Sequence, residues 1–171
     1  MQGSGGETRM QKILIAIVVS VAVAAELHAQ AGKSQNMRMN NVRPGTFIST
    51  SRPTRVTGEG QTTQSGVKYW DIYSGSGEAA MKGHTVTVLY GAWLESGPMF
   101  ASSMSDGRPS IFTLGVGQVI RGWEEGVEGM KVGGRRQLKI PAELAYGVSG
   151  VPGLVPPNAT LTLDVELIGL Q

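Results

Sequence analysis

Hydrophobic and polar residues alternate most clearly over residues 161–167, close to the C-terminal end of the sequence. Four aliphatic side chains fall on one face of this segment, and Thr, Asp and Glu fall on the other. This period is typical of a half-buried strand in an antiparallel sheet. Residues 67–73, 85–90, 111–114 and 136–140 are also short, apolar and bounded by turn-forming residues, and they are predicted as four further strands.

Only residues 119–130 have a helical period. Ile120, Trp123, Val127 and Met130 recur there at spacings of three and four, which places them on one face of a helix. Five strands and one short helix predict an α+β domain in which the helix covers the apolar face of the sheet.

The N-terminal segment has the pattern of a secretory signal peptide over residues 1–31. An apolar run at 13–25 follows Arg9 and Lys12 and precedes a small-residue Ala-Gln-Ala box. A spanning helix needs roughly 20 apolar residues, so cleavage is expected and an uncleaved anchor is the alternative. We therefore expect an exported protein, periplasmic or secreted, without stable membrane insertion after cleavage.

Residues 32–64 differ from the rest in composition. They are rich in Ser, Thr, Asn, Gly and Gln, carry five Lys or Arg against Glu59 alone, and lack a helical or strand period. This pattern predicts a flexible basic tether, without which the domain at 65–171 should still fold. Contact of the tether with an anionic membrane or cell wall is the alternative interpretation.

Composition excludes several classes of function. The 171 residues have a net charge of +2, which is too weak to indicate nucleic-acid binding. Cysteine is absent, so disulfides, zinc–thiolate sites and cysteine nucleophiles are excluded. His28 and His84 are the only histidines, which excludes a multi-histidine metal site.

Four segments carry a specific resemblance. Residues 114–127 (LGVGQVIRGWEEGV), 129–136 (GMKVGGRR), 140–147 (IPAELAYG) and 155–161 (VPPNATL) are similar, in this order, to the FKBP-type peptidyl-prolyl cis-trans isomerases. The resemblance extends over the whole domain at 65–171. It implies an antiparallel sheet of five or six strands curled around one short helix, with a proline pocket between helix and sheet.

The resemblance implies an enzyme that isomerises X-Pro bonds in proline-containing polypeptides and so helps exported proteins to fold. The barrier to rotation about a peptide bond is ~18–20 kcal/mol. No bond is made or broken, so the reaction needs no nucleophile, metal or cofactor. An apolar pocket favours the twisted amide, which is less polar than the planar one, over the planar ground state.

Site residues follow from the same resemblance. The catalytic pocket is expected to contain Tyr90, Phe100, Trp123 and Tyr146. Trp123 would form its floor, Tyr90 and Phe100 its walls, and the Tyr146 phenol would donate a hydrogen bond to the ligand. Further contacts with substrate are expected from Val119, Ile120, Val155 and Leu163. Among these, the backbone N–H of Ile120 would meet a ligand carbonyl.

The chain departs from the family pattern on one wall of the pocket. Ala101 stands where the family usually has Asp, Asp106 aligns with an Arg, and Ser110 and Leu163 replace aromatic residues. We predict a wider, more neutral pocket and reduced catalytic efficiency. Two functions stay open: an active prolyl isomerase, or a weakly active or non-catalytic binding and chaperone module on the same scaffold. A dimerising helix before the domain is missing, so we expect a monomer.

Overall fold

The computed structural model describes residues 51–95 and 97–171, so the expected signal peptide and residues 32–50 of the expected tether lie outside it. Within these residues the strands are β1 (Gln61–Thr62), β2 (Lys68–Tyr73), β3 (Thr85–Leu94), β4 (Met99–Ser102), β5 (Ser110–Thr113), β6 (Arg135–Ile140) and β7 (Leu161–Leu170). They contain one α-helix, α2 (Arg121–Val127), and one 3-10 turn, η3 (Ala142–Leu144). No helix of the described residues is long and apolar enough to cross a membrane.

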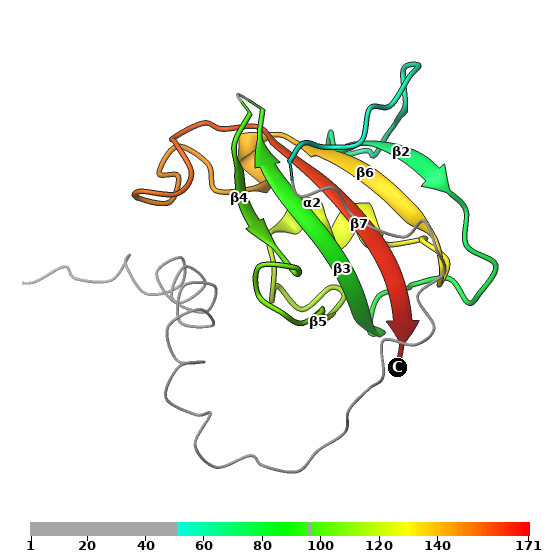
Figure 1. Ribbon diagram of the computed structural model, residues 1–171. Helices are drawn as coiled ribbons and strands as arrows, with labels where there is room; N and C mark the ends of the chain where they lie inside the picture. Colours follow the sequence, from blue (N-terminus) through cyan, green and yellow to red (C-terminus); the bar gives the residue numbers. More distant parts are fainter. Residues whose placement is uncertain (1–50, 96) are drawn as a thin grey trace, which may run out of the picture. The chain divides into compact units, whose positions relative to one another are not determined.

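All seven strands join one antiparallel sheet in the order β1-β2-β6-β7-β3-β4 (Figure 1). β5 also pairs with β3, beside β4 and on the edge of β3 that does not pair with β7. β3 and β7 are the longest strands, and their pairing runs from Val86 opposite Leu170 to Leu94 opposite Leu161. The predicted α+β class and all five predicted strands are confirmed. β1 and β4 were not predicted: β1 has only two residues, and the four residues of β4, Met-Phe-Ala-Ser, do not alternate between apolar and polar.

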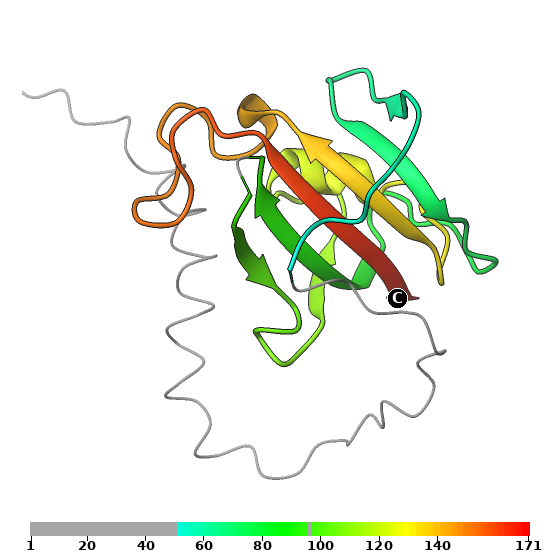
Figure 2. The same ribbon diagram turned by 45° about the horizontal axis from the view of Figure 1, so that its top comes forward.

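Alternation in the central strands builds the core. Leu161, Leu163, Val165 and Leu167 of β7 are all at most 2% exposed, as their period predicts. Helix α2 covers this inner face of the sheet (Figure 2). It lies close to β6 because its inward positions include two glycines, at 122 and 126. A Cβ at either position would collide with the side chain of Ile140 or Leu138.

The helix is shorter than the apolar spacing predicted. Ile120 has an extended backbone (ψ 143°) and precedes the first turn, while Glu128 leaves the helical conformation after the last. Met130 stays buried, but it does so in a loop whose backbone pairs with Ala80 through two hydrogen bonds. Helical spacing of apolar residues therefore continued into a segment that packs in the core without being helical.

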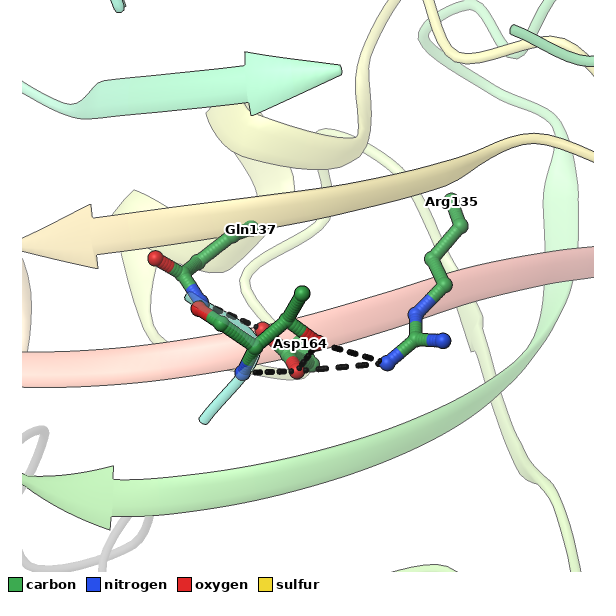
Figure 3. Close-up of polar contacts among 4 residues, drawn as sticks. Arg135, Gln137 and Asp164 are labelled. Atoms are coloured by element: carbon green, nitrogen blue, oxygen red, sulfur yellow. Dashed lines mark hydrogen bonds and ion pairs between the residues drawn. The ribbon is translucent and has the colours of Figure 1, made fainter. Parts of the chain in front are cut away.

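Residues 51–60, here called the strap, cross the outer face of the sheet, opposite α2 (Figure 2). Thr54 donates to Asp164 Oδ2 from its N–H (2.9 Å) and its hydroxyl (2.6 Å). Its carbonyl accepts from Gln137 Nε2 at 2.6 Å, and its hydroxyl accepts from Arg135 Nη2 at 2.8 Å. Figure 3 shows Arg135, Gln137 and Asp164 converging on this point. The sequence pattern had predicted that the strap is part of a flexible tether.

Contacts beyond Thr54 also place the N-terminal limit of the folded unit before Ser65. The Trp70 indole N–H donates to the carbonyl of Gly58 at 3.1 Å, and β1 pairs with the beginning of β2. The expected boundary between tether and domain is thus corrected: residues 54–62 belong to the folded domain.

Glu166 is the second acidic residue of β7 on the outer face. It is 7% exposed and lies opposite Arg135 in the β6–β7 pairing, and its Oε2 has no hydrogen-bond partner among the described residues. Burial raises the pKa of the Glu166 carboxyl, and the positive charge of Arg135 opposes this shift only in part. The native state therefore binds a proton here more readily than the unfolded chain does.

We expect Glu166→Gln to become more stable relative to the parent as the pH rises. A carboxyl whose pKa is raised by folding stabilises the native state below its unfolded pKa, near 4.3, and loses this contribution as the pH rises through the folded value. Urea unfolding from pH 4 to pH 7.5 measures the difference, with Glu143→Gln, at an exposed position, as the control. A constant difference across this range would contradict the assignment.

Candidate active site

Eight residues predicted for the pocket come from five parts of the fold. Tyr90 lies on β3, Phe100 on β4 and Leu163 on β7. Trp123 lies in α2, and Val119 and Ile120 directly precede this helix. Tyr146 and Val155 lie in the segment between η3 and β7. All eight belong to the main hydrophobic cluster of the domain, which comprises its whole core: Ile120, Trp123, Val155 and Leu163 are buried in it, and Tyr90, Phe100, Val119 and Tyr146 pack against it partly buried.

Trp123 lies at the centre of the aromatic groups. Its ring is 4.8 Å from that of Tyr90 and 5.3 Å from that of Phe112, at tilts of 58° and 57°. These distances are in the range in which tilted aromatic pairs attract. The faces of the indole ring are apolar, and its N–H has no acceptor among the described residues. Phe112, which was not among the predicted site residues, also contacts this ring, and alternation in residues 110–113 places it on the inner face.

Besides the Trp123 indole N–H, two further hydrogen-bond donors of the cluster have no partner among the described residues. The backbone N–H of Ile120 and the hydroxyl of Tyr146 bond to no other group among the described residues. The carbonyl of Ile120, in contrast, accepts from the N–H groups of Trp123 and Glu124 and so fixes the peptide at the start of α2. Burial raises the pKa of the Tyr146 phenol, which keeps it protonated and able to donate.

Val155 is positioned by a loop that pairs with itself. Val151 and Val155 exchange both backbone hydrogen bonds, at 2.7 and 2.9 Å, and form an isolated bridge. The N–H of Asn158 donates to the carbonyl of Gly147 and closes the loop before β7. Val155 is consequently only 3% exposed, and its side chain joins the same cluster as Trp123.

Two of the departures from the family pattern, Ala101 and Asp106, lie on β4 and in the turn after it. Ala101 is half-buried against the cluster and carries no polar group. The Tyr90 hydroxyl instead donates to Asp106 Oδ2 at 3.2 Å. Burial, and then the charge and the hydrogen bond of Asp106, raise the pKa of Tyr90, with a smaller contribution from nearby Tyr146. The two phenols are therefore close together and neutral. They differ in hydrogen bonding, because the Tyr90 hydroxyl donates to Asp106 and the Tyr146 hydroxyl donates to no group among the described residues.

A separate depression lies beside α2. It shares only Val119 with the predicted pocket and is otherwise lined mainly by glycines and charged side chains, including Lys82, Arg121 and Glu124. Neither Trp123 nor Tyr146 lines it, so this depression does not have the apolar character that a proline ring requires.

Comparison with known proteins agrees with this geometry. Residues 76–168 match the family described as FKBP-type peptidyl-prolyl cis-trans isomerase. The chain is 52% identical over 98 residues to an FK506-binding protein of Neisseria meningitidis serogroup B, which covers 57% of this chain and 90% of that protein. It is 56% identical over 93 residues to the peptidyl-prolyl cis-trans isomerase FPR2 of Saccharomyces cerevisiae, covering 54% of this chain and 69% of the yeast protein.

A solved structure extends the similarity to three dimensions. The crystal structure of AtFKBP13 superimposes with a TM-score of 0.63 at 38% sequence identity, over 67% of this chain and all of that one. Because the family model matches more than half of the chain, the chain belongs to the FKBP-type peptidyl-prolyl cis-trans isomerase family, and the solved structure agrees with this assignment.

Proposed function

We propose that this protein catalyses cis-trans isomerisation of X-Pro bonds in polypeptides. The observation that carries the proposal is the cluster around Trp123, where an apolar ring surface lies next to donors that no protein group uses. Membership of the family implies the activity, and the names of the Neisseria and yeast relatives agree with it. Proline-containing chains are therefore the proposed substrates.

In the proposed mechanism the proline ring packs on the Trp123 indole, between Tyr90 and Phe100. Val119, Val155 and Leu163 complete the apolar surface. A planar amide is polar because of resonance, and twisting removes that polarity. An apolar pocket therefore stabilises the twisted amide relative to the planar one, which loses more favourable interactions with water on binding.

Two of the free donors orient the substrate. The Ile120 N–H and the Tyr146 hydroxyl would each bind a carbonyl that flanks the proline, one from the residue before α2 and one from the loop after η3. Neither donor transfers a proton, since the reaction makes and breaks no bond. Uncatalysed isomerisation takes tens to hundreds of seconds, so even modest stabilisation of the twisted state accelerates folding.

We expect Tyr146→Phe to lower kcat/KM for a proline peptide about fivefold, which corresponds to about 1 kcal/mol for a lost hydrogen bond. A protease-coupled proline-peptide assay at several enzyme concentrations measures it. Tyr69→Phe is the matched control, because the Tyr69 hydroxyl donates to Gln61 on the exposed edge of the sheet. If both variants retain the parent's kcat/KM, Tyr146 does not orient the substrate.

Export is the proposed location, as the pattern of residues 1–31 indicates, and a monomer is the proposed state. The role would then be to assist folding of exported proteins. A fractionation of cells that produce the full chain, with mass determination of the mature N-terminus, tests the export. Uncleaved protein in the soluble cytoplasmic fraction would contradict it.

Ala101 favours a second function, a weakly active or non-catalytic binding and chaperone module. The carboxylate that the family usually places at this position is replaced by a methyl group. The same assay separates the two functions: a rate proportional to enzyme concentration supports the isomerase. Binding of a proline peptide without any acceleration, together with suppressed aggregation of an unfolded protein, supports the second.

A further inference from the structure

The hydroxyl of Tyr90 is held by a carboxylate from outside the cluster. Asp106 lies in the turn between β4 and β5, five residues after Ala101, and its carboxylate is exposed to solvent on one side. Its Oδ2 accepts from the Tyr90 phenol at 3.2 Å. A carboxylate thus reaches the edge of the proposed pocket from a position at which the family has an Arg.

The turn that carries Asp106 is attached to the backbone of Tyr90 itself. Ser103, which is 2% exposed, accepts from the Tyr90 N–H at 3.0 Å and donates to the Tyr90 carbonyl from its hydroxyl (3.2 Å) and its N–H (3.0 Å). The N–H of Asp106 donates to the carbonyl of Ser102 at 3.1 Å. One end of the turn therefore binds the main chain of Tyr90, while Asp106 binds the end of its side chain.

Holding both ends of Tyr90 restricts the position of its ring. The ring contacts the Trp123 indole at 4.8 Å and 58°, and this contact forms the junction of floor and wall in the proposed pocket. Because the Tyr90 proton is directed to Asp106, this phenol presents its ring, and Tyr146 supplies the free hydroxyl. The two tyrosines then have different roles.

We propose that Asp106 is a positioning residue for the isomerase reaction, which holds the Tyr90 ring against Trp123 in place of the missing carboxylate at position 101. The inference rests on the proposed function. It predicts that the wall of the pocket depends on the turn between β4 and β5, and that the change to Ala101 is compensated within the same turn.

The test is a double-mutant cycle of Asp106→Ala and Tyr90→Phe, measured as kcat and KM for a proline peptide in the full chain. We expect Asp106→Ala to lower kcat/KM about three- to tenfold, and to have little further effect once Tyr90 is Phe. Asp106→Asn keeps an acceptor and should recover most of the activity. Arg108→Ala is the control, because it removes a charge from the same exposed turn.

Relocation of the carboxylate gives a second measurement. Ala101→Asp combined with Asp106→Ala should restore at least half of the activity that Asp106→Ala alone loses. Additive effects of Asp106→Ala and Tyr90→Phe, or equal loss in Asp106→Ala and Arg108→Ala, would overturn the proposal. Thermal unfolding of each variant shows that the losses do not come from unfolding.

The ring resonances of Tyr90, which depend on the nearby indole, distinguish failure of the inference from failure of the proposed function. If the parent protein does not accelerate isomerisation, but Asp106→Ala shifts these resonances and Asp106→Asn does not, the positioning role stands and the isomerase function fails. If the parent is active and the resonances and kcat/KM are unchanged in Asp106→Ala, the positioning role is wrong and the isomerase function stands.

Discussion

Replacing Trp123 with Ala is expected to lower the free energy of unfolding by about 3–5 kcal/mol, the range for truncation of a buried Trp, and to bring isomerisation close to the uncatalysed rate. The side chain is 9% exposed and contacts both Tyr90 and Phe112, so that its removal opens a cavity beneath the proposed wall. One residue serves the core and the pocket together.

Trp123→Leu separates these two roles. Leucine refills part of the volume and should recover much of the stability, but it lacks the broad ring surface on which proline would pack. Activity should therefore remain low in a well-folded variant. Urea unfolding and the proline-peptide assay measure both quantities.

Trp70→Leu is the control, since Trp70 lies half-buried on β2, away from the cluster. It should lose the bond to Gly58 and a little stability, with unchanged activity. Parent-like turnover by both Trp123 variants would show that the pocket lies elsewhere.

A chain that begins at Ser65 is expected to be less stable than one that begins at Ser51, by about 1–3 kcal/mol. The shorter chain lacks Thr54, which satisfies both Asp164 and Gln137. Asp164 is 0% exposed, and a buried carboxylate that loses hydrogen bonds is strongly destabilising. Thermal and urea unfolding of the two chains measure the difference.

Thr54→Val tests the same site in the full chain. It removes the hydroxyl that bridges Asp164 and Arg135 but keeps the shape of the side chain. Thr57→Val, at an exposed position of the strap, is the matched control. Equal stability of the two variants, together with equal stability of the two truncated chains, would show that the strap is a tether that does not stabilise the domain.

The segments with strong periods were predicted well, and those without were not. β7 could be predicted because its alternation continues over seven residues, and the family because the motifs around Trp123 and Tyr146 are specific to it. The folded strap could not be predicted, since Thr54 binds side chains that lie 81 to 110 positions later in the sequence. A short polar segment with long-range partners has no local signal.

The apolar residues of the proposed site could be expected from the family resemblance, but the hydrogen bond between Tyr90 and Asp106 could not. Alignment marked Asp106 only as a changed residue, because its distance from the Tyr90 hydroxyl depends on the conformation of the turn after β4. The same turn contains Ser103, whose hydrogen bonds to Tyr90 need the pairing of β3 with β4. Neither contact follows from residue types alone.

The division of one sheet edge between β4 and β5 has a consequence for solubility. Each of these strands has four residues, and the turn that carries Asp106 separates them. A long uninterrupted edge exposes a row of unpaired backbone groups to which another extended chain can add. An isomerase works among unfolded polypeptides that offer such strands, and a broken edge gives them only short segments to join. The turn would thereby protect the protein from co-aggregating with its own substrates.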